Sequence, residues 1–206
     1  MNIQNKSSKN SLEFKSIDYQ LQPYTNPELI KENGPQVFRS GRGVEVKDID
    51  GNSYIEGMSG LWCASLGFNE IELVEAAITQ MKKLPFYHSF TGKTCESTIN
   101  LSEKLIEVAP NNLKKIFFCN SGSEANDTAI KIVWYYHASL GNPQKRKIIS
   151  RKGSYHGVTL ASASLTALDY AQKGFGLPLD FAIHTTWPHY FQNSNNNETE
   201  EDFCNR

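Results

Sequence analysis

The strongest constraint on the fold is a short polar turn between an apolar run and a helix. The turn Asn120–Asp127 reads NSGSEAND and directly follows Lys115–Cys119, whose sequence KIFFC is typical of a strand. Helical spacing then continues from about Ser123 to Leu140, where a glycine and a proline end it. The order strand, tight turn and helix is the building unit of α/β proteins with parallel sheets.

The same turn is suited to bind a phosphate group. The first amides of a helix lack intrahelical partners and carry the positive end of the helix dipole. Gly122 lets the backbone approach an anion closely, and the hydroxyls of Ser121 and Ser123 add donors. The alternative is simple capping of the helix by Ser121 or Ser123, with Glu124 in the first turn, which needs no ligand. Both interpretations stay open at this point.

A second polar turn, Ser154–Gly157, follows the predicted strand Lys147–Ser150. Open α/β sheets bind their ligands at the carboxyl ends of such strands. Tyr155 and His156 are flat rings that can stack on a heteroaromatic ligand. The alternative is a turn that carries an ordinary histidine.

The remaining pattern predicts an α/β protein with a mainly parallel sheet. A hairpin is expected around Asp50-Gly51. Residues 21–29, with two prolines, are expected to be irregular, and Asn69 to cap the helix that follows it. Helices are predicted at 71–81, 96–108 and 157–168, a strand at 181–185 and the first turn of another helix at 198–203. We expect a flexible leader at 1–16, an N-terminal segment with the hairpin at 17–66, and the first part of a larger domain at 67–206.

Composition excludes several classes of protein. The chain has 21 basic and 22 acidic side chains, so it lacks the basic surface that non-specific nucleic-acid binding needs. No apolar run approaches the ~18 residues of a membrane-spanning helix, and the first sixteen residues hold no signal-peptide core. Four cysteines are widely spaced without metal-ligand spacing, which predicts free thiols and no metal site. We expect a cytoplasmic protein that binds neither nucleic acid nor membrane.

Four stretches together resemble the class III, or ω-amino acid, family of pyridoxal-phosphate-dependent aminotransferases. They are DIDGNSYIEGMSGLWCASLGF, LPFYHSF, IFFCNSGSEANDTAIK and RKGSYHGVTLASASLT, and they occur in the order and at the spacing of the family. The resemblance covers about residues 20 to 190 and implies fold type I, here as an N-terminal small-domain segment plus the first part of the large domain. LWCASLGF and LPFYHSF look most like the branch that transfers amino groups between ω-amino acids or amines and pyruvate.

The resemblance implies roles for eight residues. Ser121, Gly122 and Ser123 would hold the phosphate of pyridoxal 5′-phosphate, while Tyr155 would stack on the pyridine ring with His156 beside it. Three aromatic residues would line the substrate pocket, namely Trp62, Phe90 and, at the entrance, Tyr24. The alternative for these three is packing in a core or an interface. The family also implies a homodimer whose interface holds the active site.

The family further implies catalytic groups that we do not expect in these 206 residues. Its Schiff-base lysine and the acid that pairs with the pyridine nitrogen occur later in longer chains. Lys131, Lys147 and Lys152 lack the expected context, and the Gly174-Phe-Gly176 match has no acidic strand end before it. We therefore expect no catalytic residue here and no activity of this chain alone.

Two other functional interpretations stay open. One is a non-catalytic product of a truncated or split gene. The other is an unrelated phosphate-binding α/β module, which is less favoured because the chain holds neither GxxxxGK[ST] nor GxGxxG.

Overall fold

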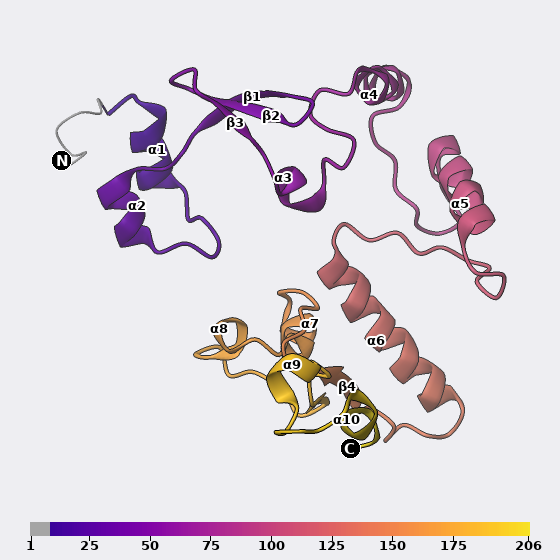
Figure 1. Cartoon of the computed structure of the whole chain (residues 1–206). Coiled ribbons are helices and arrows are strands. Elements are labelled where there is room, and N and C mark those ends of the chain that lie inside the picture. The colour runs from indigo at the N-terminus through magenta and orange to yellow at the C-terminus, as the bar shows by residue number, and fades with distance from the viewer. Residues whose placement is uncertain (1–8) are drawn as a thin grey trace. The chain divides into compact units, whose positions relative to one another are not determined.

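The computed structural model describes residues 9–206 (Figure 1). These residues divide into two compact units. The first unit ends at Glu96 and the second runs from Ser97 to Arg206. This division places residues 67–96 with the first unit. The domain boundaries at 16/17 and 66/67 stay predictions.

Two short helices open the described part of the first unit. In α1 (Leu12–Tyr19), the Ser11 hydroxyl accepts a hydrogen bond from the Phe14 amide. Residues 12–16 of the expected leader are therefore helical, and residues 1–8 lie outside the described range. In α2 (Pro27–Asn33), Asn26 caps the helix and Pro27 takes its first position. The expectation of irregular structure throughout 21–29 is wrong, because asparagine followed by proline is itself a helix-start signal.

A three-stranded antiparallel sheet with order β1-β2-β3 follows. Its strands are β1 (Phe38–Arg42), β2 (Glu45–Asp48) and β3 (Ser53–Ile55). The β2–β3 pair confirms the hairpin predicted around Asp50-Gly51. The Asp48 carboxylate holds its turn by accepting bonds from the amides of Asp50 and Asn52, the Asn52 side chain and the Tyr54 hydroxyl.

This carboxylate makes the hairpin sensitive to acid. The bond from the Asn52 side chain, followed by those from Tyr54 and the backbone, lowers the pKa of Asp48 below its ordinary value of 3.8. Since the pKa is lower in the folded state, the stabilisation is complete above pH 3.8 and is lost as the pH falls through the folded-state pKa. We expect Asp48→Asn to destabilise the chain at neutral pH, with the difference shrinking below pH 3.8 in denaturant unfolding followed at several pH values. A difference that is constant with pH would contradict this prediction.

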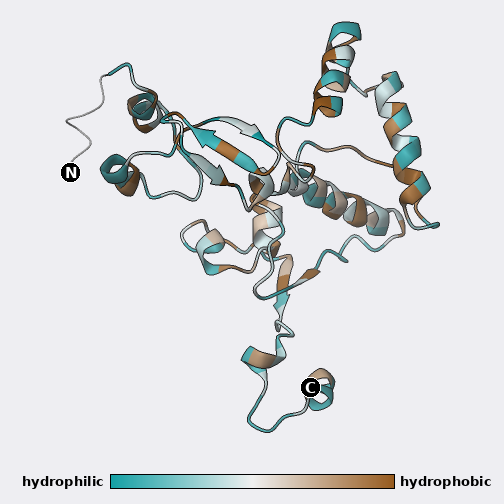
Figure 2. Cartoon of the chain, turned by 45° about the horizontal axis from the view of Figure 1, so that its top comes forward, coloured by the Kyte–Doolittle hydropathy of each residue, from teal (hydrophilic) through white to brown (hydrophobic). Residues whose placement is uncertain are grey.

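The first unit continues with α3 (Ser59–Trp62) and α4 (Ile71–Lys83). Helix α4 confirms the predicted helix. Its apolar residues recur at helical spacing, so brown and teal segments follow one another along its ribbon (Figure 2). The expected cap at Asn69 is wrong. Asn69 adopts φ 58°, and the N-cap is Glu70, whose side chain makes no capping bond.

The long helix of the second unit is α6 (Gly122–Ser139), which confirms the prediction and ends before Gly141. It is preceded by α5 (Glu96–Val108), also as predicted. The strand predicted at Lys115–Cys119 does not form among the described residues. Since a strand is defined by its pairing, an apolar run without a neighbouring strand cannot become one.

The parallel pair β4 (Ile148–Arg151) and β5 (Ala182–Thr185) confirms both predicted strands. Between them lie α7 (Leu160–Leu165) and α8 (Asp169–Gln172), so the helix expected at 157–168 is shorter than predicted. Gly157, with φ 130°, is not helical, and Thr159, the N-cap of α7, has an extended backbone. Ser162, Ser164 and Thr166 are fully buried here.

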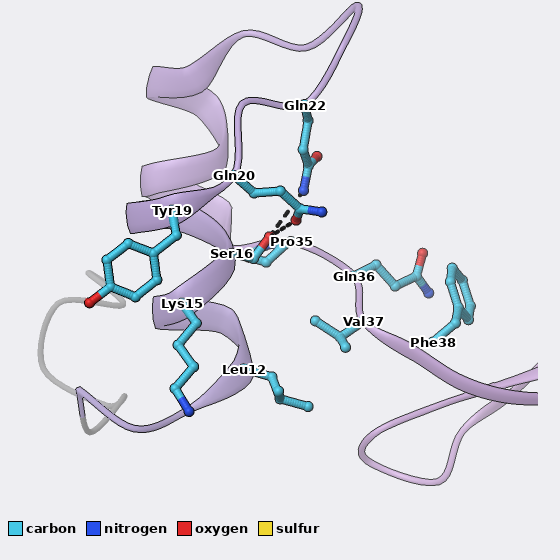
Figure 3. Close-up of a pocket in the computed structure, with 10 residues that line it drawn as sticks. All are labelled: Leu12, Lys15, Ser16, Tyr19, Gln20, Gln22, Pro35, Gln36, Val37 and Phe38. Carbon is cyan, nitrogen blue, oxygen red and sulfur yellow. Dashed lines mark hydrogen bonds between the residues drawn. The ribbon is translucent and has the colours of Figure 1, made fainter.

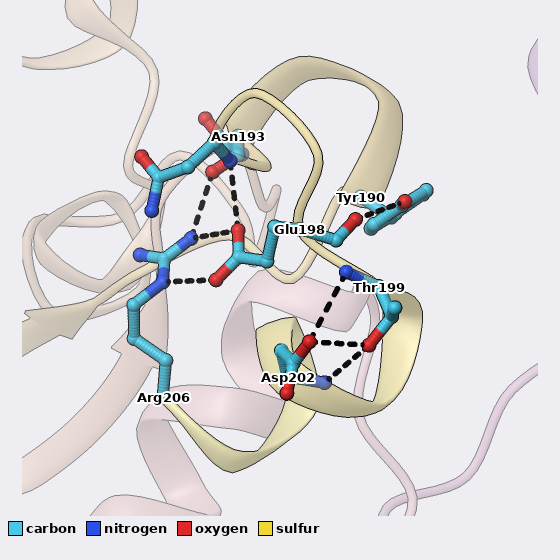
Figure 4. A network of polar contacts seen from close by, with 7 residues as sticks. Tyr190, Asn193, Glu198, Thr199, Asp202 and Arg206 are labelled. Carbon is cyan, nitrogen blue, oxygen red and sulfur yellow. Dashed lines mark hydrogen bonds and ion pairs between the residues drawn. The ribbon is translucent and has the colours of Figure 1, made fainter.

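The C-terminal part holds α9 (Tyr190–Asn193) and α10 (Glu200–Asn205). Thr199 and Asp202 form a capping box at the start of α10, as the acidic turn predicted. The Arg206 guanidinium binds both oxygens of Glu198 and the Asn193 carbonyl, at 2.8 to 3.0 Å (Figure 4). None of the helices between residues 9 and 206 has both the length and the apolar character needed to cross a membrane.

Candidate functional site

The N-terminus of α6 presents two amides without acceptors. Ser121 is the N-cap, and its hydroxyl accepts a bond from the Glu124 amide at 3.2 Å. Within residues 9–206, no group accepts a hydrogen bond from the amides of Gly122 or Ser123. A Cβ added at Gly122 would meet nothing within 4 Å, so a bound anion could approach the backbone closely there. This end of an 18-residue helix fits a phosphate group.

The Ser123 side chain is held in place from the neighbouring turn. Its Oγ accepts a bond from the Val158 amide at 3.0 Å, while the Ser123 hydroxyl proton has no acceptor among the described residues. The hydroxyl is therefore fixed in position and its proton is free to be donated to a ligand. Capping, the alternative interpretation of this turn, is confirmed for Ser121, with Glu124 in the first turn, and is wrong for Ser123.

Gly157 brings the second polar turn against the start of α6. A Cβ at this buried position would lie 2.5 Å from Ser123 Oγ and 2.7 Å from Ser162 Cβ. Its φ of 130° is also unfavourable for residues with a side chain. Only glycine allows the two turns to approach this closely.

The second turn itself is ordered by polar contacts. The His156 amide donates to Thr166 Oγ1 at 2.8 Å, and the His156 carbonyl accepts from the Asn126 side chain at 2.6 Å. Ser154 Oγ lies 3.1 Å from His156 Nε2. Tyr155, between them, is 53% exposed, so its ring is free to contact a ligand.

The structure thus brings the five residues predicted for the cofactor into one part of the second unit. Sequence reasoning missed Asp127, Ser162 and Asn126, which connect the two turns. One signal was present in the sequence, because Asp127 lies four residues after Ser123 and therefore on the same face of α6.

Trp62 lies in the first unit, at the end of an unusual left-handed turn. Ser59, Gly60, Leu61 and Trp62 all have φ between 50° and 68°. Consecutive residues in this conformation are costly, and such strain concentrates at functional sites. The Glu56 carboxylate supports the turn by accepting bonds from the amides of Met58 and Gly60, at 3.1 and 2.7 Å. The Trp62 side chain is 73% exposed.

The other two aromatic residues predicted for the substrate pocket also lie in the first unit. Phe90 is 75% exposed and its amide donates to His88 Nδ1 at 3.2 Å. Tyr24 is 68% exposed, with φ 53°. None of the three is part of a core within the described unit.

A pocket of about 480 Å³ in the first unit lies between α1 and the segment that leads into β1 (Figure 3). Leu12, Val37 and Phe38 form apolar parts of its wall, and Ser16 accepts a bond from Gln22 on its polar side. Its lining includes none of the residues predicted for cofactor or substrate. Among residues 9–206, no cluster of three potential metal ligands occurs.

Comparison with known families gives a match over most of the chain. The sequence model described as Aminotransferase class-III matches residues 30–206. A vanillin aminotransferase of Capsicum frutescens is 48% identical over 173 residues, which cover 84% of this chain and 38% of the relative. Gamma aminobutyrate transaminase 1 of Solanum lycopersicum, a mitochondrial enzyme, is 44% identical over 94% of this chain and 38% of the relative.

Solved structures of transaminases also match this chain over most of its length. The omega transaminase from Pseudomonas jessenii in complex with PMP is 51% identical, with a TM-score of 0.92, over 95% of this chain and 43% of that structure. Two engineered thermostable omega transaminase variants, each 50% identical over 95% of this chain and 44% of theirs, also have TM-scores of 0.92. The chain therefore spans about two fifths of the length of these relatives.

Proposed function

Because this chain belongs to the class III aminotransferase family, of which it matches the N-terminal part, we propose that it binds the phosphate end and one ring face of pyridoxal 5′-phosphate for amino-group transfer. Enzymes of this family use pyridoxal 5′-phosphate as cofactor and have fold type I. The observation that carries the proposal is the pair of unpaired amides at Gly122 and Ser123, beside a hydroxyl whose proton is free.

In the proposed arrangement, the residues of this chain bind and orient. The α6 amides and the Ser123 hydroxyl would neutralise and fix the phosphate, and Tyr155 would cover the ring. When bound, the cofactor supplies an electron sink for chemistry at the amine carbon. The substrates we propose are an amine or ω-amino acid as donor and a 2-oxo acid such as pyruvate as acceptor.

The test uses a full-length chimera, in which this chain replaces the matching segment of the Pseudomonas jessenii omega transaminase. We expect Gly122→Val in the chimera to raise the dissociation constant of pyridoxal 5′-phosphate about tenfold or more, because branched carbons would occupy the space through which the anion reaches the amides. The matched control is Ala129→Val, at an exposed position of the same helix. The two substitutions should change the melting temperature of the cofactor-free chimera by similar amounts. Unchanged cofactor affinity in Gly122→Val would contradict the phosphate site.

Trp62 and Phe90 are proposed as walls of the substrate pocket. One of the engineered relatives carries a tryptophan-to-glycine change, and the other carries changes at the same tryptophan, at a phenylalanine and at an arginine. Both were engineered for asymmetric synthesis of enantiopure bulky amines. That tryptophan and phenylalanine are as many positions apart as Trp62 and Phe90, which supports the same role here.

We expect Trp62→Gly in the chimera to favour bulky amines. Removing the indole opens space, so the ratio of kcat/KM for a bulky amine over a small one should rise about tenfold. Trp62→Phe, which keeps an aromatic wall, is the matched control and should change the ratio little. If both variants leave substrate preference unchanged, Trp62 does not line the pocket.

The proposal extends to the assembly, the activity and the location of the protein. We propose a homodimer for the complete enzyme and no transaminase activity for the 206-residue chain by itself. The exposed aromatic side chains of Trp62, Phe90 and Tyr24 support this proposal, because large exposed apolar side chains favour burial against further protein. The cytoplasmic location stays a prediction.

A further inference from the structure

We propose that Asp127 is a positioning residue that joins the phosphate turn and the ring-stacking turn into one rigid cofactor site. The phosphate turn is Ser121–Ser123, and the ring-stacking turn is Gly153–Thr159. The inference rests on the proposed function, since it assumes that both turns contact one cofactor. It concerns how the two halves are held at the correct separation.

One carboxylate oxygen of Asp127 accepts hydrogen bonds from three groups. Asp127 Oδ1 lies 2.7 Å from Thr159 Oγ1, 3.0 Å from the Ser162 amide nitrogen and 2.7 Å from Ser162 Oγ. All three groups are donors, and an ionised carboxylate accepts such bonds more strongly than a neutral oxygen. Asp127 thereby fixes both the end of the ring-stacking turn and the start of α7.

Ser162 carries the connection back to the phosphate turn. Its Oγ also lies 2.9 Å from the Ser123 carbonyl oxygen, so its single proton is shared between that oxygen and Asp127. Ser162 is completely buried, so its hydroxyl depends on these protein partners and not on solvent for its hydrogen bonds. Ser123 is in turn bonded to the Val158 amide. The loop of contacts therefore closes through Asp127, Ser162, Ser123 and Val158.

This closed loop has a consequence for binding. A ligand that joins a phosphate and a ring gains affinity from the linkage only when the protein holds the two subsites at the matching separation. Loosening the connection should therefore weaken binding of the joined ligand more than binding of either half. A purely structural role for Asp127 predicts equal changes for all three ligands.

The experiment measures three dissociation constants in the chimera, for pyridoxal 5′-phosphate, for pyridoxal and for inorganic phosphate. We expect Asp127→Ala to raise the constant for pyridoxal 5′-phosphate about tenfold more than either of the others, because part of the linkage gain is lost. Asp127→Asn keeps an acceptor oxygen and should restore most of the affinity. Asp169→Ala, which removes an exposed carboxylate at the start of α8, is the matched control and should change nothing.

Hydrogen exchange adds a readout without cofactor. In the cofactor-free chimera, the amides of Val158 and Ser162 should exchange faster in Asp127→Ala than in the unsubstituted protein, since their acceptors become mobile or absent. If Asp127→Ala does not fold, Ser162→Ala gives the same comparison, because it removes one hydroxyl from the loop and leaves the carboxylate in place.

The outcomes separate the inference from the function it rests on. A selective loss for the joined ligand supports the positioning role. Equal changes for the three ligands, or no change, overturn it while leaving the cofactor site intact. Failure of the unsubstituted chimera to bind pyridoxal 5′-phosphate would instead overturn the proposed function, and this inference with it.

Discussion

The purified 206-residue chain, mixed with an amine donor, pyruvate and pyridoxal 5′-phosphate, is expected to show no transamination above the rate of the cofactor alone. The reaction needs an amine that binds the cofactor covalently and then moves a proton at the reacting carbon. We do not expect Lys131, Lys147 or Lys152, which flank the two cofactor turns in the described second unit, to fill this role. The expected loss relative to a complete enzyme is therefore total.

The position of each of these lysines shows why. Lys131 lies about two and a half turns into α6 from Gly122. Lys147 precedes β4, at the end of the strand opposite the ring-stacking turn, and its ammonium donates to the Asp180 carbonyl. Lys152 adjoins that turn, but its side chain is exposed.

The control is the chimera, which contains the remaining part of a related enzyme and should turn over the same substrates. Product formation by the 206-residue chain that disappears in Lys152→Ala would show that this lysine acts catalytically. That result would contradict the expected inactivity.

The parts of the fold that could be predicted are those with local causes. The hairpin around Asp50-Gly51 and the helices α5 and α6 each follow from turn residues, caps and spacing within a few positions. The parallel pairing of β4 with β5 followed from the alternation of strands and helices. These signals act over short stretches, so the sequence displays them directly.

The errors arose where a residue's conformation depends on distant contacts. Lys115–Cys119 is apolar enough for a strand but finds no neighbour among the described residues. Asn69 adopts φ 58° in the turn after Phe68, whose amide and carbonyl bond with Gly43. Pairings of this kind are not visible in a local pattern of residues.

The candidate site also has features with local causes, which could be predicted, and features that depend on distant contacts, which could not. The helix start at Ser121 and Gly122 could be predicted, because a capping serine and a glycine directly precede the helical spacing, although the strand expected before them does not form among the described residues. The role of Asp127 and Ser162 could not, since it depends on a contact between residues 35 positions apart. The assignment of the cap to Ser121 also required the structure.

Gly157→Ala is expected to reduce cofactor affinity in the chimera by two orders of magnitude. The added methyl carbon would lie 2.5 Å from Ser123 Oγ, the atom we propose to donate to the phosphate, and 2.7 Å from Ser162 Cβ. Overpacking of this kind costs about 1–3 kcal/mol, and the upper end of that range corresponds to roughly a hundredfold rise in the dissociation constant when the displaced Ser123 hydroxyl no longer reaches the phosphate.

Gly174→Ala isolates the steric part of this effect. Gly174 also has a positive φ, of 87°, but a Cβ there meets nothing within 4 Å. Backbone strain alone should therefore lower the stability of both cofactor-free variants, whereas only Gly157→Ala should displace Ser123 and lose affinity for pyridoxal 5′-phosphate. Melting of the cofactor-free proteins and titration with the cofactor measure the two quantities separately. Equal affinities in the two variants would mean that the close approach of Gly157 to Ser123 does not shape the phosphate site.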